Sequence, residues 1–214
     1  MRGVVMLLTS IRPLESKATD YFYNALHPDI SSDTNLVSIP FGNDIYKILR
    51  NYLVGVTEPK EPGGYAQFTI EVLLPNFEPR NQANGADFNS AGFGNRLHAD
   101  IQFGRKYISP QDALQEIMKF GGVSKDDYYV TRSGYRFYKL HPNSFGSELY
   151  VLNSQKEKFF FWCHTEKYVL YPGCEVMESI GKNVTAEYSF GQKYIDSAYD
   201  IDKSLIKFLD KFKK

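Results

Sequence analysis

The residue types with the greatest chemical reactivity in this chain gather in one short stretch, FWCHTEKYVLYPGCEV, residues 161–176. It contains both cysteines of the chain, Cys163 and Cys174, and His164 follows the first of them directly. Thiols, imidazoles and carboxylates serve as nucleophiles, as general bases and as metal ligands. Two cysteines at this spacing have a further use, because they can join neighbouring strands through a disulfide.

The spacing of these residues argues against a metal site. Cys163 and His164 are adjacent, so in a strand their side chains point to opposite faces. Paired zinc thiolates are about two to four residues apart, a much shorter spacing than that between Cys163 and Cys174. The chain has four histidines, which are His27, His98, His141 and His164. None of them forms the i, i+4 pair with a glutamate that a zinc-protease helix requires, and we predict no metal.

The two cysteines flank a predicted hairpin. KFFFWC is a strongly apolar strand, Tyr171-Pro172-Gly173 is a turn, and CEVMESI is a second strand. A disulfide between Cys163 and Cys174 would stabilise the fold by about 2–3 kcal/mol in an oxidising compartment. We favour this disulfide, and buried free thiols are the alternative. A third interpretation is an enzyme in which Cys163 is a nucleophile and His98 or His164 its base, because such partners can come from anywhere in a fold.

Composition and length exclude several classes of function. Lysine plus arginine equals aspartate plus glutamate at 25 each, so no overall positive field attracts nucleic acid or an anionic membrane. No stretch approaches the roughly 20 apolar residues that cross a bilayer, and the apolar run at residues 4–8 is shorter than a secretory signal requires. The GFGN segment at residues 92–95 lacks the remaining residues of a phosphate-binding loop. We therefore predict no nucleic-acid binding, no membrane insertion and no cofactor.

Periodicity predicts the elements of the first half of the chain. Apolar spacing in residues 14–26 predicts a helix that ends before Pro28, and a polar connection is expected after it. Alternation of apolar and polar residues predicts strands over residues 65–72 and 96–104. The Asn- and Gly-rich segment between them, residues 81–95, predicts an exposed, mobile loop.

The second half combines a well-capped helix with many short strands. Ser109 and Asp112 resemble a capping box, and an apolar stripe then continues until Gly121-Gly122 stops the helix. Turn residues recur through the following segment, which is typical of an antiparallel meander. An amphipathic helix from about Ile195 closes the chain.

These elements predict the fold class. Strands in the middle with helices at both ends indicate an α+β fold, mainly an antiparallel sheet with flanking helices, including the C-terminal amphipathic helix. We expect a single α+β domain over residues 1–214. The alternative is a pair of lobes, residues 1–105 and 106–214, divided near residue 105.

The order of features resembles a known family. YAQFTIEVLLPNFEPRNQANGADF joins a strand to a Leu-Pro-Asn-Phe-x-Pro turn and an Asn-rich segment. FFFWCHTEKYVLYPGCEV and VTAEYSFGQKYIDSAYDIDKSLIKFLDKF add a Cys strand, a Pro-Gly-Cys turn, a Tyr-Ser strand and a closing amphipathic helix. Over roughly residues 38–105 and 158–213, this pattern resembles soluble immunity proteins encoded beside type VI secretion toxins.

The resemblance implies a protein that binds a cognate toxin effector and blocks its active site sterically, so that the producing bacterium survives. No catalytic residue carries over, and the protein is not expected to be an enzyme. Such proteins are commonly exported to the periplasm, where Cys163 and Cys174 would be oxidised, although the absence of a convincing signal peptide leaves the cytoplasm as an alternative. The rival interpretations are a non-catalytic envelope-associated protein-binding module and an enzyme with a dispersed Cys/His site.

Two segments are expected to contact the toxin, namely residues 81–95 and 126–138. Tight interfaces centre on aromatic and arginine anchors within a polar rim, and both segments supply such residues. The candidates for toxin binding are Asn84, Asp87, Phe93, Arg96, Asp127, Tyr129, Arg132 and Tyr135.

Overall fold

A computed structural model of the chain describes residues 32–41, 44–57, 66–104, 109–141, 148–152, 154, 159–165 and 170–214. The strands are β1 (Leu36–Phe41), β2 (Asp44–Leu49), β3 (Leu53–Thr57), β4 (Ala66–Leu73), β5 (Arg96–Phe103), β6 (Tyr129–Val130), β7 (Tyr135–Lys139), β8 (Glu148–Leu152), β9 (Phe160–Cys163), β10 (Gly173–Gly181) and β11 (Val184–Gly191). The helices are α2 (Gly85–Asn89), α3 (Pro110–Phe120) and α4 (Ala198–Asp210), with the 3-10 turns η1 (Arg50–Tyr52) and η2 (Gln192–Ser197). The helix predicted over residues 14–26 lies outside the described residues.

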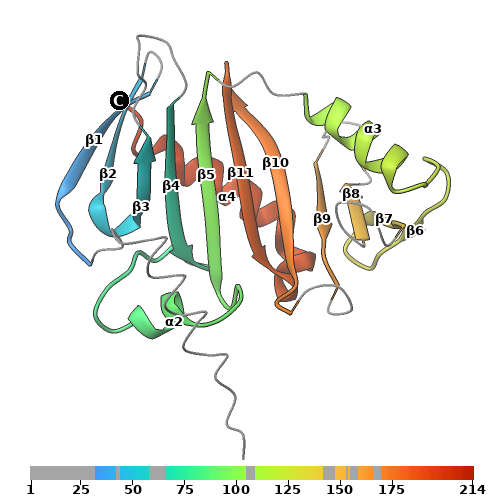
Figure 1. Cartoon of the computed structure of the whole chain (residues 1–214), viewed down its shortest axis with the longest axis horizontal. Helices are drawn as coiled ribbons and strands as arrows, with labels where there is room; N and C mark the ends of the chain where they lie inside the picture. Colours follow the sequence, from blue (N-terminus) through green and yellow to red (C-terminus); the bar gives the residue numbers. More distant parts are fainter. Residues whose placement is uncertain are drawn as a thin grey trace, which may run out of the picture.

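A nine-stranded antiparallel sheet forms the frame of the molecule, in the order β3-β4-β5-β11-β10-β9-β8-β7-β6 (Figure 1). Strands β6 to β11 follow one another as neighbours, which confirms the predicted meander. The last of them, β11, then pairs with β5 from Leu97 opposite Phe190 to Phe103 opposite Val184. The expected α+β fold with a mainly antiparallel sheet is confirmed. Both sides of residue 105 contribute to this one sheet, and the division into lobes stays a prediction.

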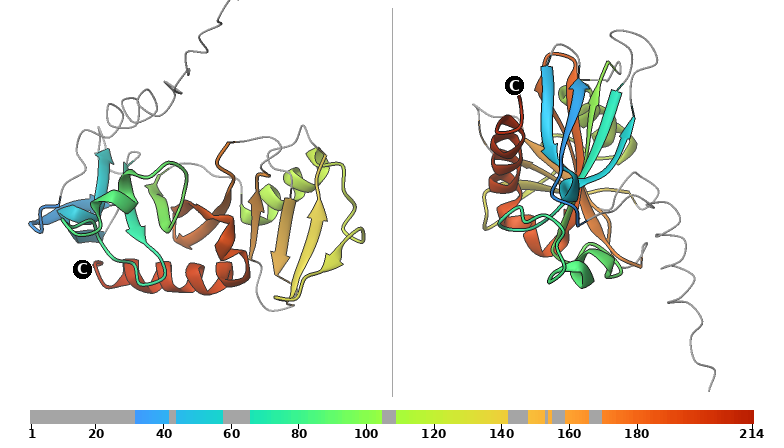
Figure 2. Two further views of the ribbon diagram at one scale, coloured as in Figure 1. Left: turned by 90° about the horizontal axis from the view of Figure 1, so that it is seen from below. Right: turned by 90° about the vertical axis from the view of Figure 1, so that its left-hand side faces the viewer.

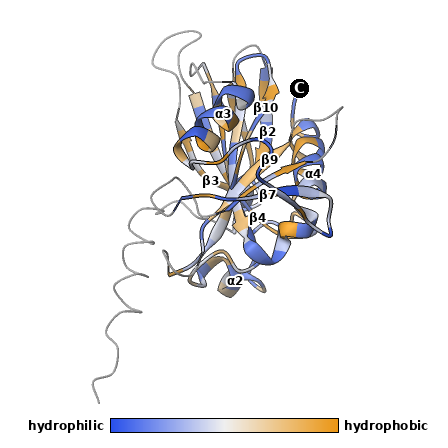
Figure 3. Cartoon of the chain, turned by 90° about the vertical axis from the view of Figure 1, so that its right-hand side faces the viewer, coloured by the Kyte–Doolittle hydropathy of each residue, from blue (hydrophilic) through white to orange (hydrophobic). Residues whose placement is uncertain are grey.

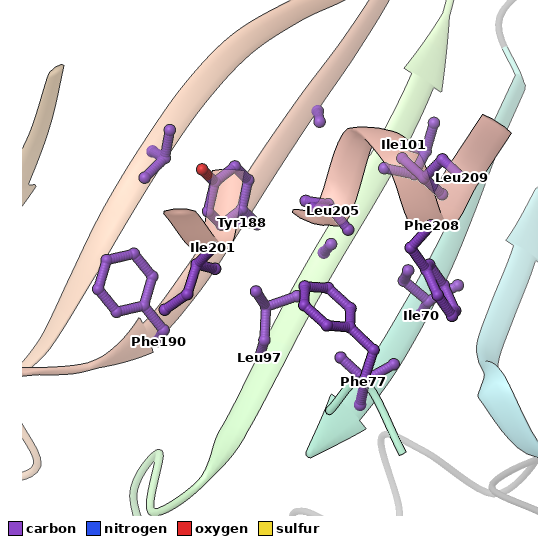
Figure 4. Close-up of a cluster of buried hydrophobic side chains, with 14 of the residues drawn as sticks. Ile70, Phe77, Leu97, Ile101, Tyr188, Phe190, Ile201, Leu205, Phe208 and Leu209 are labelled. Atoms are coloured by element: carbon purple, nitrogen blue, oxygen red, sulfur yellow. The ribbon is translucent and has the colours of Figure 1, made fainter. Parts of the chain in front are cut away.

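Helix α4 covers one face of the sheet, which we call the α4 face. Strand alternation places Phe68, Ile70 and Val72 of β4 on this face, and all three are fully buried. The apolar stripe of α4 packs onto them and onto side chains of β5 and β11 (Figure 4). The predicted C-terminal helix is therefore confirmed. Its α-helical part begins at Ala198, because the residues from Gln192 to Ser197 form the 3-10 turn η2.

Helix α3 lies on the opposite face, at the β6–β9 end of the sheet (Figure 2). Its predicted start is confirmed, because the Ser109 hydroxyl accepts a hydrogen bond from the Asp112 amide at 3.1 Å. Ala113 and Ile117 then pack in a second cluster that contains Leu149 and Phe160. Both α3 and α4 carry hydrophilic and hydrophobic residues side by side, as amphipathic helices do (Figure 3).

The segment between β4 and β5 differs from the expected mobile loop. Residues 85–89 form helix α2, and Phe88 is only 1% exposed. The Arg96 guanidinium donates hydrogen bonds to the carbonyl oxygens of Phe88 at 2.9 Å and Ser90 at 2.8 Å, and to that of Gly92. Most of this segment is exposed, as expected, but it is not a loop throughout. One buried phenylalanine and one buried arginine hold it against the sheet.

The polar connection expected before β4 was also wrong. Strands β1 and β2 form a separate two-stranded sheet, and β3 joins the edge of the large one. Phe41 and Tyr46 of this hairpin pack in edge-to-face or tilted contact with Phe68, at ring-centroid distances of 5.1 and 5.2 Å. The Lys47 amide donates a hydrogen bond to the Phe212 carbonyl at 2.8 Å, which ties the hairpin to the end of the chain.

Candidate functional site

The second face of the central strands is polar. Because side chains alternate along a strand, Glu71, His98, Ser189 and Glu175 form one row across β4, β5, β11 and β10. Thr69, Asp100 and Glu187 form a second row beside the first, and Gln67, Gln102 and Thr185 form a third. We call these three rows the polar face. Among the described helices none lies in front of these strands (Figure 1).

A cavity of about 400 Å³ opens where the polar face meets α3. We call it the acidic cavity. The charged or ionisable residues that line it are His98, Asp100, Glu116, Glu175 and Glu187. The apolar part of its wall comes from Ala113, Ile117, Trp162 and Met177. It therefore joins several carboxylates to an apolar surface, and it is large enough for more than one side chain.

A network of hydrogen bonds fixes the carboxylates of the polar face. Asp100 accepts hydrogen bonds from the Gln67 amide at 2.9 Å and from the Thr69 hydroxyl at 2.5 Å. The Gln102 amide donates to Glu187 at 3.2 Å. These donors are neutral, so they orient the carboxylates and leave their negative charge in place.

His98 lies among acidic residues. Its Nδ1 atom is 3.3 Å from the Glu71 carboxylate, and its Nε2 atom is 4.0 Å from Asp100. Glu71 also lies 3.7 Å from the Arg96 guanidinium. Ser189 is opposite His98 in the sheet register, but no hydrogen bond joins these two side chains in the described part of the chain.

The cysteines form a disulfide at the register position where β9 and β10 pair. The Cys163 and Cys174 sulfurs are 2.06 Å apart, their Cα atoms are 4.0 Å apart, and both residues are fully buried. The disulfide leaves no Cys163 thiolate to act as a nucleophile, and the expectation that the protein is not an enzyme stays a prediction. His164 instead contacts Glu175 at 3.3 Å. No group of three potential metal ligands occurs among the described residues.

The predicted toxin-binding residues of the first segment lie within α2 or close to it in the chain. Asp87 is exposed, whereas Asn84 and Phe93 are half-buried. The Asn84 side chain accepts a hydrogen bond from the Asn81 amide at 2.8 Å and donates one to the Pro79 carbonyl at 3.0 Å. Phe93 lies directly over Gly173, where only a glycine leaves room for its ring. Arg96 is 7% exposed and has the structural role described above.

The predicted residues of the second segment divide between surface and core. Asp127 and Arg132 are exposed, and Tyr129, on the edge strand β6, is 75% exposed. Tyr135 is 2% exposed, and its ring packs edge-on against Phe161 at a centroid distance of 5.2 Å. Its hydroxyl accepts a hydrogen bond from the Tyr199 amide at 3.1 Å, and burial raises its pKa to about 12. Tyr135 therefore offers almost no surface to a partner.

The structure does not bring the two predicted segments together. Helix α2 and strand β6 lie toward opposite ends of the molecule (Figure 1). The acidic cavity lies between them. His98 and the 161–176 stretch that holds Trp162 and Glu175 were conspicuous in the sequence, but nothing there linked them to Asp100, Glu116 or Glu187. The signal in the sequence for this grouping was the polar residue at every second position of β4, β5 and β11. That pattern also fits an ordinary solvent-facing side of a sheet.

No helix in the described part of the chain is long and apolar enough to cross a membrane. No protein-family model matches the sequence, and no curated protein matches it. The fold is similar to the solved structure of Smlt3025, an immunity protein of the Stenotrophomonas maltophilia type IV secretion system, with a TM-score of 0.58. The match covers 85% of this chain and 94% of that chain, at 10% sequence identity. At this identity the likeness shows a shared fold. The neighbour belongs to a type IV system, so the expected type VI context stays a prediction.

Proposed function

We propose that this protein is an immunity protein that binds a cognate secreted bacterial toxin and blocks its active site sterically. The observation that carries this proposal is the fold shared with a secretion-system immunity protein over 85% of this chain and 94% of the other. The sequence resemblance to immunity proteins encoded beside toxins supports the same role independently of that structure. Inhibition of this kind requires a surface and no catalytic group.

The fold suits an inhibitor that acts as a rigid body. One sheet of nine strands spans the molecule, and it is fastened by α4 on one face and by the Cys163–Cys174 disulfide. A rigid surface loses little conformational entropy on binding, so more of the contact energy appears as affinity. The exposed side chains of Asp127, Tyr129 and Arg132 at the β6 edge, and the acidic cavity, are the surfaces we propose for toxin contact.

The disulfide supports a periplasmic location for this function. Structural disulfides persist in oxidising compartments such as the bacterial periplasm and are rare in the cytosol. We propose that the protein acts there, against a toxin delivered by a type VI or related secretion system. Alkylation of intact cells followed by mass spectrometry checks the compartment, because a periplasmic pool has both thiols blocked by the disulfide.

The function is tested with the product of the neighbouring gene. The two proteins are expressed together, their complex is sought by size-exclusion chromatography, and survival of cells that express the neighbour is scored with and without this protein. Co-elution together with rescue supports an immunity role. Separate elution, or survival of cells that lack this protein, contradicts it and favours an envelope-associated module with another partner.

A further inference from the structure

The acidic cavity has a concentrated negative charge. Four carboxylates line it, from Asp100 on β5, Glu116 on α3, Glu175 on β10 and Glu187 on β11. The ion pairs described for these four join them only to histidines, with His98 4.0 Å from Asp100 and His164 3.3 Å from Glu175. Concave sites lined by one sign of charge concentrate the field and attract the opposite charge.

Two of the four carboxylates, Asp100 and Glu187, are held in place before any ligand binds. The neutral donors Gln67, Thr69 and Gln102 fix the orientation of Asp100 and Glu187, as described above. A ligand that binds there does not have to order these side chains, so the entropic cost of association is reduced.

The apolar lining of the cavity adjoins the carboxylates and includes Trp162, the single tryptophan of the chain, which pairs with Glu175 in the sheet register. Ile117 from α3 and Met177 from β10 add to this apolar lining. An indole ring attracts cations to its face, and the aliphatic stems of lysine and arginine pack against apolar surfaces while their charged ends stay polar. An anionic ligand would be repelled here, and a purely apolar one would leave the carboxylates desolvated without a partner.

We propose that the acidic cavity binds a basic segment of the partner protein. One arginine or lysine side chain of that segment lies with its stem along Trp162 and its cation against Glu175 and Glu187. This proposal rests on the immunity function for the identity of the partner as the toxin. Charge complementarity selects the segment, and the cavity of about 400 Å³ leaves room for a neighbouring side chain.

The first test does not require the toxin, because Trp162 fluorescence reports on this cavity alone. The peptide acetyl-Gly-Arg-Arg-Gly-amide is titrated against a matched peptide in which citrulline replaces both arginines. We expect a saturable change in emission with a Kd below about 1 mM for the arginine peptide, weakened by added salt, and a much smaller change for the citrulline peptide. Equal responses, or none up to about 5 mM, overturn the proposal.

The second test removes charge and keeps shape. The double variant Glu175→Gln/Glu187→Gln is compared with Asp210→Asn, which removes an exposed carboxylate from α4 on the other face of the sheet. The double variant is expected to lose the emission change with the arginine peptide, whereas Asp210→Asn keeps it. Urea unfolding of both variants establishes that they are folded. Retention of the change in a folded double variant overturns the proposal.

The third test uses the toxin complex and separates the two proposals. If the complex forms, the double variant is expected to raise its Kd about tenfold or more, chiefly through slower association at low salt, and Asp210→Asn is expected to leave it unchanged. An unchanged Kd in the double variant overturns the cavity as the toxin site, while the immunity function stands. If no complex forms, the immunity function fails, and the peptide titration still decides whether the cavity binds basic segments.

Discussion

The two faces of the central sheet are made by the same strands, yet different interactions stabilise them. On the α4 face, Ile70 of β4 is fully buried and packs in the apolar cluster beneath α4. The next residue, Glu71, points to the polar face and contacts His98 and Arg96. One face is stabilised by apolar burial and the other by hydrogen bonds and ion pairs. The α4 face therefore carries the hydrophobic contribution to stability, and the polar face is the one we propose for recognition.

The sharpest test of this comparison replaces one residue on each face. Leu205 of α4 is 1% exposed, and Leu205→Ala is expected to lower the free energy of unfolding by about 4 kcal/mol through lost burial and a cavity. Ser189→Ala on the polar face is expected to change it by no more than about 0.5 kcal/mol. Urea denaturation of both variants measures this contrast. Similar losses in the two variants would show that side chains on the two faces contribute equally to stability.

The disulfide adds stability within the buried cluster of the α4 face. The double variant Cys163→Ala/Cys174→Ala is expected to have a free energy of unfolding about 3 kcal/mol lower than that of the unmodified protein. The disulfide joins residues 11 positions apart, and without it the unfolded chain is no longer constrained by that closed loop. Urea denaturation with and without a reductant measures this loss. The stability of the double variant should not change when reductant is added. The stability of the unmodified protein should fall, on reduction, to about that of the double variant.

Glu178 is an exception on the α4 face, since it places a carboxyl group beneath α4. Burial, with a further contribution from nearby Asp202, raises its pKa from 4.5 to about 7. Asp202 itself is 3% exposed and accepts a hydrogen bond from the Tyr188 hydroxyl at 2.8 Å. Two acidic groups are thus close together where the helix meets the sheet.

The raised pKa of Glu178 predicts a pH dependence with a defined sign. Between about pH 4.5 and 7 the folded protein holds a proton that the unfolded chain releases, so this group's contribution to stability is greatest below that window. It is lost as the pH rises through 7. Glu178→Gln is therefore expected to raise the free energy of unfolding at pH 8 by about 1 kcal/mol, after allowance for partial exposure, and to have little effect at pH 5. Unfolding measured at both values checks this, and an equal effect at the two would contradict it.

The smallest effect on stability is expected at the β6 edge. Tyr129→Ala removes a side chain that is 75% exposed, so the free energy of unfolding should change by less than about 0.5 kcal/mol. If this edge contacts the toxin, the same variant should weaken the complex by about 1 kcal/mol or more, as an aromatic anchor would. Calorimetry of the complex measures this, with Lys139→Ala on neighbouring β7 as an exposed control.

Elements with strong local patterns were predictable from the sequence. Strands β4 and β5 alternate regularly, α3 has a serine cap, and α4 has a continuous apolar stripe, so each follows from its own residues. The β1–β2 hairpin and α2 were not predicted. Phe41 is buried against Phe68 and Phe103, which are distant in the sequence. The Phe88 carbonyl is held by the Arg96 guanidinium. The burial of both residues therefore depends on tertiary contacts.

The candidate site depends even more on contacts between residues that are distant in the sequence. Asp100 and Glu187 are far apart in the sequence, and they meet because β5 and β11 pair with this register. A shift of one residue would have placed Glu187 on the α4 face. The toxin-binding residues chosen by composition included Arg96 and Tyr135, which the fold buries. Composition identifies residues that are suited to an interface, but burial decides which of them reach the surface.

By itself, the sequence determined helices α3 and α4, most strands, the α+β class and a hairpin whose cysteines can meet, because these follow from periodicity and turns within a few residues. The tertiary structure alone decided the order of the sheet, the face that each strand presents and the gathering of four carboxylates beside Trp162. The physical reason is that strand register, and which face of the sheet a helix packs on, depend on contacts between distant segments. Such contacts are selected by the free energy of the whole fold.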